Sequence, residues 1–235
     1  MYLKDIKPLV GIFVQARLNS TRFPGKIMKK LYNNTTVLDF LLKRLSLCKR
    51  NDKLVIATTD NPKDDLLVKW LHKNNYKYFR GSESNCLKRF YDAAILFNID
   101  FIVRITSDCP LVPPDLVDSM IQYYIKNFHY IDYLSNRQFT NYPEGVDIEI
   151  FKTSMLAEAL KNNTVKNEEE HINYYFLNRP EKYRLRYFMH KFDKDYSRFK
   201  LSIDTPSDLK DIRNIFRSKK LALNFSTNDL LKVLD

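Results

Sequence analysis

The first half of the chain alternates short apolar runs with amphipathic stretches. Residues 9–14 are apolar throughout, which is typical of a strand covered on both faces. Residues 37–47 then place four leucines at helical spacing. The same alternation continues through strands expected at 53–58, 76–79 and 101–105, with helices at 64–72, 87–97 and after Pro113. Strands that alternate with helices predict a mostly parallel sheet flanked by helices on both faces.

The second half has a different pattern. Residues 123–142 are rich in tyrosine and asparagine and show no clean alternation. Beyond them we expect strands at 146–151, 184–189 and 199–203, and helices at 154–160, 168–177, 206–217 and 228–233. No linker divides the chain. The sequence therefore predicts one Rossmann-like α/β domain over residues 1–235, with residues about 128–190 as a mixed α/β excursion.

Composition places the chain among globular proteins. Its 235 residues are 44% hydrophobic and 29% charged. The three cysteines, Cys48, Cys86 and Cys109, are scattered and lack metal-ligand spacing, which favours a reducing compartment. No apolar run approaches the roughly 20 residues that a membrane span needs. We expect a cytoplasmic protein that does not bind membranes.

The net charge of +11 has two interpretations. A polyanionic partner is one, and a proteome rich in lysine and asparagine is the other. The basic residues are spread along the chain, and no dense block resembles a nucleic-acid-binding tail. We therefore expect no nucleic-acid partner, although a basic face with interleaved aromatics would be the signature of one.

A basic loop follows the first expected strand. It includes Ala16, Arg17, Ser20, Thr21, Arg22 and Lys26, with a Pro-Gly turn before the lysine. Backbone N–H groups and hydroxyls can take phosphate oxygens there, while the three cations neutralise them. An ordinary basic surface loop is the alternative. Ligands of such sheets bind beyond the carboxyl ends of the strands, which favours a triphosphate site.

Two carboxylates follow later strands. Asp108 comes directly after the strand expected at 101–105, where an oxygen ligand beside a triphosphate suits a hard divalent cation. Asp204 follows the strand expected at 199–203 and precedes Thr-Pro, a helix start. From its position alone, Asp204 is equally a helix N-cap or a metal ligand.

The loop Gln-Ala-Arg-x-x-Ser-Thr-Arg-x-Pro-Gly-Lys resembles the opening motif of the cytidylyltransferase family, which activates ketodeoxyoctonate and sialic-type acids with CTP. The chain is most similar to its SpsF-type polysaccharide-biosynthesis members. Further matches follow in order along nearly the whole chain. They are Ile56–Asp60, Arg80–Ser82, Arg104–Leu111, Glu144–Glu149 and Ser202–Pro206.

The resemblance implies a fold of the nucleotide-diphospho-sugar transferase type and roles for particular residues. Asp108 and Asp204 would hold Mg²⁺, and Arg17, Lys26 and Asp108 would be catalytic. Asp60, Arg80 and Ser82 would contact cytosine or ribose, with turn-forming or solvated roles as the alternative. Ser107 would also contact the nucleotide. Many relatives have glycine at this position, so the hydroxyl of Ser107 would narrow the space through which the nucleotide approaches.

The acceptor site has three candidates. Strand periodicity places Asp147 and Glu149 on one face, where they could bind sugar hydroxyls or belong to a plain amphipathic strand. His171 lies on an expected helix and resembles part of a Glu-His pair in SpsF-type members; a structural histidine is the alternative. The tyrosines at 123, 124, 130, 133, 174 and 175 would form a homodimer surface, as in similar enzymes, or pack in the core.

Together these features predict a magnesium-dependent cytidylyltransferase. It would join CMP from CTP to a sugar acid or a sugar or polyol phosphate and release pyrophosphate. A glycosyltransferase that uses a nucleotide-sugar donor is the alternative. The three cations between Arg17 and Lys26 exceed what such a donor needs. The sequence does not name the acceptor.

Overall fold

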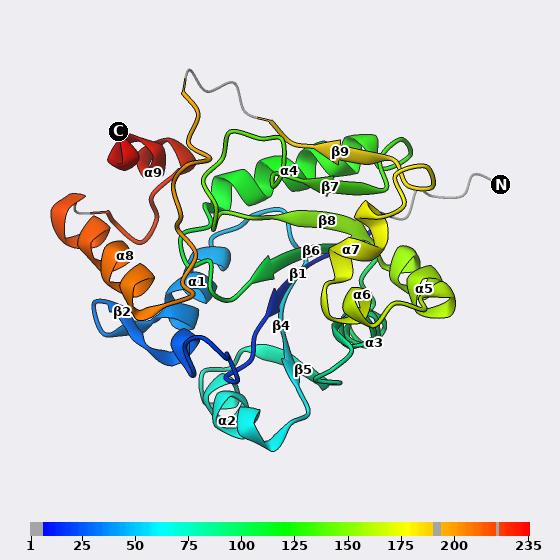
Figure 1. Ribbon diagram of the computed structural model, residues 1–235, viewed down its shortest axis with the longest axis horizontal. Coiled ribbons are helices and arrows are strands. Elements are labelled where there is room, and N and C mark those ends of the chain that lie inside the picture. The colour runs from blue at the N-terminus through cyan, green and yellow to red at the C-terminus, as the bar shows by residue number, and fades with distance from the viewer. Residues whose placement is uncertain (1–6, 190–193, 220) are drawn as a thin grey trace.

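The parallel half of the sheet is built from the strands of the first half of the chain. The computed structural model describes residues 7–189, 194–219 and 221–235, and Figure 1 shows its ribbon. Strands β1 (Val10–Gln15), β4 (Lys53–Thr59), β5 (Lys77–Gly81) and β6 (Phe101–Thr106) lie in the order β5-β4-β1-β6, all parallel. Their carboxyl ends therefore share one edge of the sheet.

The second half of the chain extends this sheet. Strand β8 (Glu149–Lys152) pairs antiparallel with both β6 and β7 (Tyr133–Ser135), and β9 (Leu185–Tyr187) pairs parallel with β7. The result is a seven-stranded, mostly parallel sheet in the order β5-β4-β1-β6-β8-β7-β9. This confirms the predicted α/β class, with a mixed extension. Residue 190, the last of the predicted excursion, lies outside the described residues.

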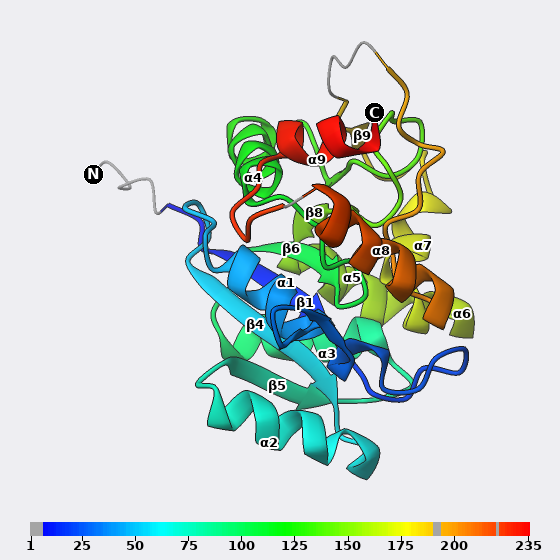
Figure 2. The same cartoon turned by 90° about the vertical axis from the view of Figure 1, so that its left-hand side faces the viewer.

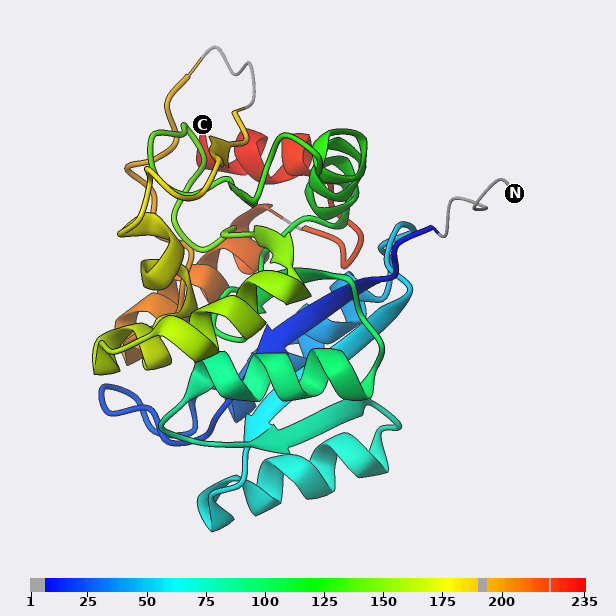
Figure 3. The same cartoon turned by 90° about the vertical axis from the view of Figure 1, so that its right-hand side faces the viewer.

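Helices cover both faces of the sheet (Figures 2 and 3). One core lies under α1 (Val37–Leu45), α2 (Asp65–Lys73), α4 (Pro114–Asn127), α8 (Pro206–Lys219) and α9 (Thr227–Leu234). The other lies under α3 (Cys86–Leu96), α5 (Thr153–Asn162) and α7 (Ile172–Leu177), which follows the short α6 (Lys166–Glu170). Two further strands, β2 (Lys30–Tyr32) and β3 (Thr35–Thr36), form a separate hairpin, and 3-10 turns lie at Lys26–Met28 and Pro62–Asp64. No helix among the described residues is long and apolar enough to cross a membrane.

Three predicted elements differ from the structure. Residues 199–203 form no strand; their one ladder contact is an isolated bridge between Glu144 and Lys200. The helix predicted at 168–177 is broken at His171, whose φ of −107° and ψ of 84° are not helical. The strand predicted from 146 begins only at Glu149, so Asp147 lies in the preceding loop.

Gly145 allows the 199–203 segment to lie beside residue 144. Its φ is +95°, and a Cβ at this position would lie 2.3 Å from the amide nitrogen of Ser202. The segment is held there by the Leu201 amide, which donates to the Glu144 carbonyl at 2.7 Å. Only glycine fits both the backbone angle and the close approach. This contact carries the chain toward Asp204.

Candidate functional site

The basic loop after β1 is fixed at both ends. The Leu18 amide donates to the Asp64 carboxylate at 2.6 Å, and the Gly25 amide donates back to the Leu18 carbonyl at 2.9 Å. Gly25 has a φ of +68°, in the left-handed region that glycine adopts readily, and Lys26 then begins a 3-10 turn. The Pro-Gly turn predicted before Lys26 therefore directs this lysine back toward the sheet edge.

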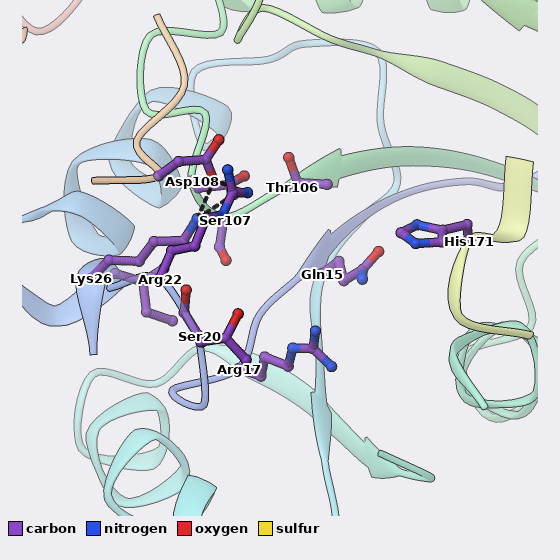
Figure 4. Close-up of a pocket in the computed structure, with 12 residues that line it drawn as sticks. Gln15, Arg17, Ser20, Arg22, Lys26, Thr106, Ser107, Asp108 and His171 are labelled. Atoms are coloured by element: carbon purple, nitrogen blue, oxygen red, sulfur yellow. Dashed lines mark hydrogen bonds and ion pairs between the residues drawn. The ribbon is translucent and has the colours of Figure 1, made fainter. Parts of the chain in front are cut away.

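Lys26 bridges the two carboxylates predicted as metal ligands (Figure 4). Its Nζ atom lies 2.7 Å from Oδ2 of Asp108 and 3.1 Å from Oδ1 of Asp204. The side chains are largely shielded from solvent, with exposed fractions of 11% for Lys26, 26% for Asp108 and 15% for Asp204. Two acids distant in sequence therefore converge on a single cation position.

Backbone contacts set this convergence. The Ile203 amide donates to the Asp108 carbonyl at 2.9 Å, which ties the two acidic loops together. Helix α8 begins at Pro206, and its cap is Thr205, whose hydroxyl accepts from the Asp208 amide at 3.3 Å. The Asp208 carboxylate in turn accepts from the Thr205 amide at 2.7 Å. The N-cap alternative for Asp204 is therefore wrong, because Thr205 and Asp208 cap the helix and leave the Asp204 carboxylate for cations.

Asp204 stays ionised because of these cations. Burial disfavours its charged form, but Lys26, Arg22 and Lys200 outweigh burial and lower the pKa of Asp204 below its ordinary value. Arg22 lies 2.8 Å from its Oδ1 and Lys200 lies 3.4 Å from its Oδ2. The position is therefore suited to holding positive charge.

A cavity of about 260 Å³ opens beside this cluster. Of the predicted residues, it brings together Arg17, Ser20, Thr21, Arg22, Lys26, Ser107, Asp108, His171 and Asp204. Arg17 lies across the cavity from Lys26 and pairs with Glu170 of α6 at 3.0 Å. Cations and hydroxyls from the loop thus face Asp108 and Asp204 across one hollow.

Four predicted nucleotide contacts do not line the cavity: Ala16, Asp60, Arg80 and Ser82. Ala16 is buried at the end of β1. Arg80 donates to the carbonyl oxygens of Thr59 and Asn61 and pairs with Asp65 at 2.8 Å. The Ser82 hydroxyl accepts from the Asn85 amide at 3.0 Å. For Arg80 and Ser82 these contacts match the turn-forming alternative, and the nucleotide roles of all four residues stay predictions.

A second cavity of about 200 Å³ adjoins the first, since Thr106 and His171 line both. All three predicted acceptor contacts, Asp147, Glu149 and His171, line it. Burial, with Glu149 adding to it and Arg137 opposing it, raises the pKa of Asp147 to about 6. The predicted acceptor residues are therefore gathered in one place, next to the cavity lined by the basic loop.

Glu149 differs from the other acceptor candidates because both of its oxygens have protein donors. Oε1 accepts from the Tyr133 hydroxyl at 2.6 Å, and Oε2 pairs with Arg104. Its side chain is only 5% exposed. These contacts tie Glu149 into the sheet, and its role toward an acceptor stays a prediction.

Sequence reasoning gave no nucleotide or acceptor role to six polar residues that line the two cavities: Gln15, Arg104, Thr106, Arg137, Asn173 and Tyr174. Gln15 and Thr106 end neighbouring strands and are paired in register. Arg104 is the single charge within the apolar run of residues 101–105. A charged residue inside a buried strand needs a partner, which is the signal that could have singled out Arg104.

The residues present fit a hard divalent cation. Asp108 and Asp204 supply oxygen ligands that converge on the Lys26 ammonium, which occupies the position of a cation between them. No cluster of three or more histidine, cysteine or acidic side chains with metal-binding geometry lies within the described residues. A cation here would therefore take its other ligands from water or from substrate phosphates.

The sequence as a whole matches a known family. A family model described as cytidylyltransferase matches residues 11–230. The chain belongs to the cytidylyltransferase family. The match begins one residue inside β1 and includes the other described strands and both acidic loops, and it confirms the resemblance seen in the motifs.

Individual relatives agree with this assignment. The chain is 30% identical to the spore coat polysaccharide biosynthesis protein SpsF of Bacillus subtilis over 227 residues, 94% of this chain and 92% of that protein. A solved cytidylyltransferase from Leptospira borgpetersenii superposes with a TM-score of 0.89 at 37% identity, covering 96% and 93% of the chains. A CMP-ketodeoxyoctonate synthetase solved with CTP has a TM-score of 0.69 at 13% identity, covering 91% and 100%, which shows a shared fold.

Proposed function

We propose that this chain transfers CMP from CTP to a sugar acid or to a sugar or polyol phosphate, with Mg²⁺ and with release of pyrophosphate. Surface polysaccharide or glycan biosynthesis is the pathway class that fits its SpsF-type relative. The proposal rests on membership of the cytidylyltransferase family and on one feature of the site. That feature is the position of Lys26, the last cation of the basic loop, between Asp108 and Asp204.

The basic loop would bind the triphosphate. Arg22 and Lys26 are paired with acids at the cavity, and phosphate oxygens would take over those cations as CTP enters. Ser20 and Thr21 line the same cavity and would donate their hydroxyls. The charge that builds up on the departing pyrophosphate would then face cations already held in place.

Asp108 and Asp204 would hold the metal once Lys26 has turned to the phosphates. When bound, Mg²⁺ would neutralise phosphate charge and polarise the α-phosphorus. The two carboxylates would supply only part of its coordination shell, so CTP and metal would bind together. An acceptor oxygen from the adjoining cavity would attack the α-phosphorus in line, without a covalent intermediate.

The acceptor would bind in the cavity of Asp147 and His171. This cavity meets the first at Thr106 and His171, so an acceptor there would have its reactive end facing the triphosphate. The site would then need only to align two substrates, because in-line transfer depends mainly on positioning and charge stabilisation.

The test is pyrophosphate release with Mg²⁺, with each of the four nucleoside triphosphates paired with a panel of acceptors. The panel includes ketodeoxyoctonate, an N-acylneuraminate, glycerol 3-phosphate and a hexose 1-phosphate. We expect release with CTP and one of these classes. Asp204→Asn should reduce it by about 100-fold or more, since it removes one carboxylate from the cation position.

Asp211→Asn is the matched control, because Asp211 lies exposed on the same helix, α8. This variant should keep wild-type activity. Turnover of a ready-made nucleotide sugar, with no pyrophosphate from any pair, would instead establish the glycosyltransferase alternative.

A further inference from the structure

A chain of polar contacts crosses four neighbouring strands and ends in the first cavity. Tyr133 of β7 donates to Glu149 of β8, which pairs with Arg104 of β6. Arg104 then donates from Nε and NH2 to Oε1 of Gln15 in β1, at 3.1 and 2.8 Å. Of these four residues, Gln15 alone lines the first cavity.

The pairing register explains why these side chains meet. Arg104 lies directly opposite Glu149 in the antiparallel ladder and opposite Phe13 in the parallel one. Gln15 is two residues beyond Phe13, so it shares the face of the sheet on which Arg104 lies. The apolar residues of that face form a core with α3, α5 and α7. The polar chain therefore forms the rim of a buried core.

The two charged residues among these polar contacts are both largely shielded from solvent. Arg104 has an exposed side-chain fraction of 11% and Glu149 of 5%. Burial disfavours the charge of Arg104, but the Glu149 carboxylate outweighs it and raises the pKa of Arg104 above its ordinary value. Arg104 thus remains a permanent donor, held in one orientation by Glu149.

This donor determines which way the Gln15 amide faces. A guanidinium group has no acceptor, so the atom of Gln15 that faces Arg104 must be the carbonyl oxygen. The amide nitrogen is left with two N–H donors, and it makes no hydrogen bond within the described residues. Figure 4 shows Gln15 between Arg17 and His171, away from Lys26 and Asp108.

We propose that the Gln15 amide, oriented by Arg104 and Glu149, donates a hydrogen bond to an oxygen of the acceptor and so helps to select it. The inference rests on the proposed function. Gln15 lines the first cavity, its hydrogen-bond partner Arg104 lines the second, and its register partner Thr106 lines both, so the amide lies where an acceptor in the second cavity would reach the triphosphate. A donor fixed at that junction selects acceptors that present a hydroxyl, carboxylate or phosphate oxygen there.

The direct test follows the side-chain amide signal of Gln15 in ¹H–¹⁵N NMR spectra, assigned by its loss in Gln15→Glu. Mg²⁺ and CTP are added first, then ketodeoxyoctonate, an N-acylneuraminate, glycerol 3-phosphate and a hexose 1-phosphate in turn. We expect the signal to move when one of these compounds is added and to be little changed by CTP. A signal that moves with CTP and with none of the four compounds overturns the proposal, as does one that moves with nothing. Absence of CTP binding by backbone signals would instead count against the proposed function.

Kinetics with the acceptor so found provide a second test. Gln15→Glu keeps an oxygen facing Arg104 but replaces the N–H donors with an oxygen, while Gln15→Met removes the donors without adding charge. Both should raise the acceptor KM by about tenfold or more, with the CTP dissociation constant of Gln15→Met within about twofold of wild type. Gln122→Glu, on α4 and outside both cavities, controls for added charge. An acceptor KM unchanged in both Gln15 variants overturns the proposal.

Discussion

The Nζ atom of Lys26 lies 3.1 Å from Oδ1 of Asp204, although 178 residues separate the two in sequence. The same ammonium lies 2.7 Å from Asp108. A lysine therefore neutralises the two acids that are proposed to hold a metal. Under the proposed function, this arrangement would link phosphate binding by the basic loop to metal binding by the acids.

Lys26→Met should make the protein depend on divalent cations for stability. Without the ammonium, Asp108 loses its ion pair and Asp204 keeps only Arg22 and Lys200, so the melting temperature should fall. Mn²⁺ at about 100 times its dissociation constant should then restore about 2.7 kcal/mol, measured by thermal unfolding. Lys29→Met, at an exposed neighbouring position, should show no such cation-dependent gain. A Lys26→Met variant that is indifferent to Mn²⁺ would contradict a metal site at these two acids.

Glu149→Gln should destabilise the protein by about 3–5 kcal/mol, because it leaves the guanidinium of Arg104 buried without a countercharge. The double variant Arg104→Met/Glu149→Leu removes both charges and should lose far less. Urea unfolding of Glu149→Gln and of the double variant measures the difference. Equal losses in Glu149→Gln and in the double variant would show that the ion pair has no special role.

Regular strands and strand-end motifs could be predicted from the sequence because their patterns are local. Strands β1, β4 and β6 are built on apolar runs, which Arg104 interrupts in β6, and polar motifs follow each of them. Since parallel strands share one edge for their carboxyl ends, the basic loop and Asp108 could be expected to lie near each other. Asp204 also lies near Asp108, on the other side of the Lys26 ammonium, although no strand precedes it in the structure.

The expectation for residues 199–203 failed for a physical reason. Leu201 and Ile203 are 2% and 0% exposed, and Ser202 between them is 7% exposed, so the alternating apolar residues belong to a segment that is buried throughout. An extended segment packed on a core gives this pattern whether or not it joins a ladder. Strand β7 was not predicted, because this short buried strand lies in a tyrosine-rich segment with no clean alternation of apolar and polar residues.

The polar chain that ends at Gln15 could not be predicted either. It depends on the pairing of β8 with β6 and β7, which joins residues far apart in sequence. The break at His171 is marked by no glycine or proline. Local sequence therefore predicted a larger share of the residues that line the first cavity than of those that line the second.

Gly145→Ala should cost about 3 kcal/mol or more of stability. The new Cβ would meet the backbone of Leu201 and Ser202 at a φ of +95°. Gly25→Ala is the matched comparison: its φ is +68°, but a Cβ there has nothing within 4 Å, so it should lose only about 1 kcal/mol. Urea unfolding compares the two. Similar losses would show that the close approach at Gly145 is not what requires glycine.

Asp147→Asn should change how stability depends on pH. The folded pKa of Asp147 is about 6, above its ordinary value of 3.8, so the folded state holds a proton more tightly than the unfolded one. Stability from this group is thus present below about pH 4 and lost as pH rises through 6. The variant should be more stable than wild type at pH 7.5, by up to about 3 kcal/mol, with the gain fading toward pH 4. A pH-independent difference would contradict the raised pKa.

The proposed reaction is tested most directly by following the label from CTP carrying ³²P at the α- or the γ-position. With Mg²⁺ and the acceptor that supports turnover, α-label should appear in the acceptor product and γ-label in pyrophosphate. Both should disappear together in Asp204→Asn and persist in Asp211→Asn. Transfer of the γ-label to the acceptor, or retention of both labels in CTP while a nucleotide sugar is consumed, would contradict attack at the α-phosphorus.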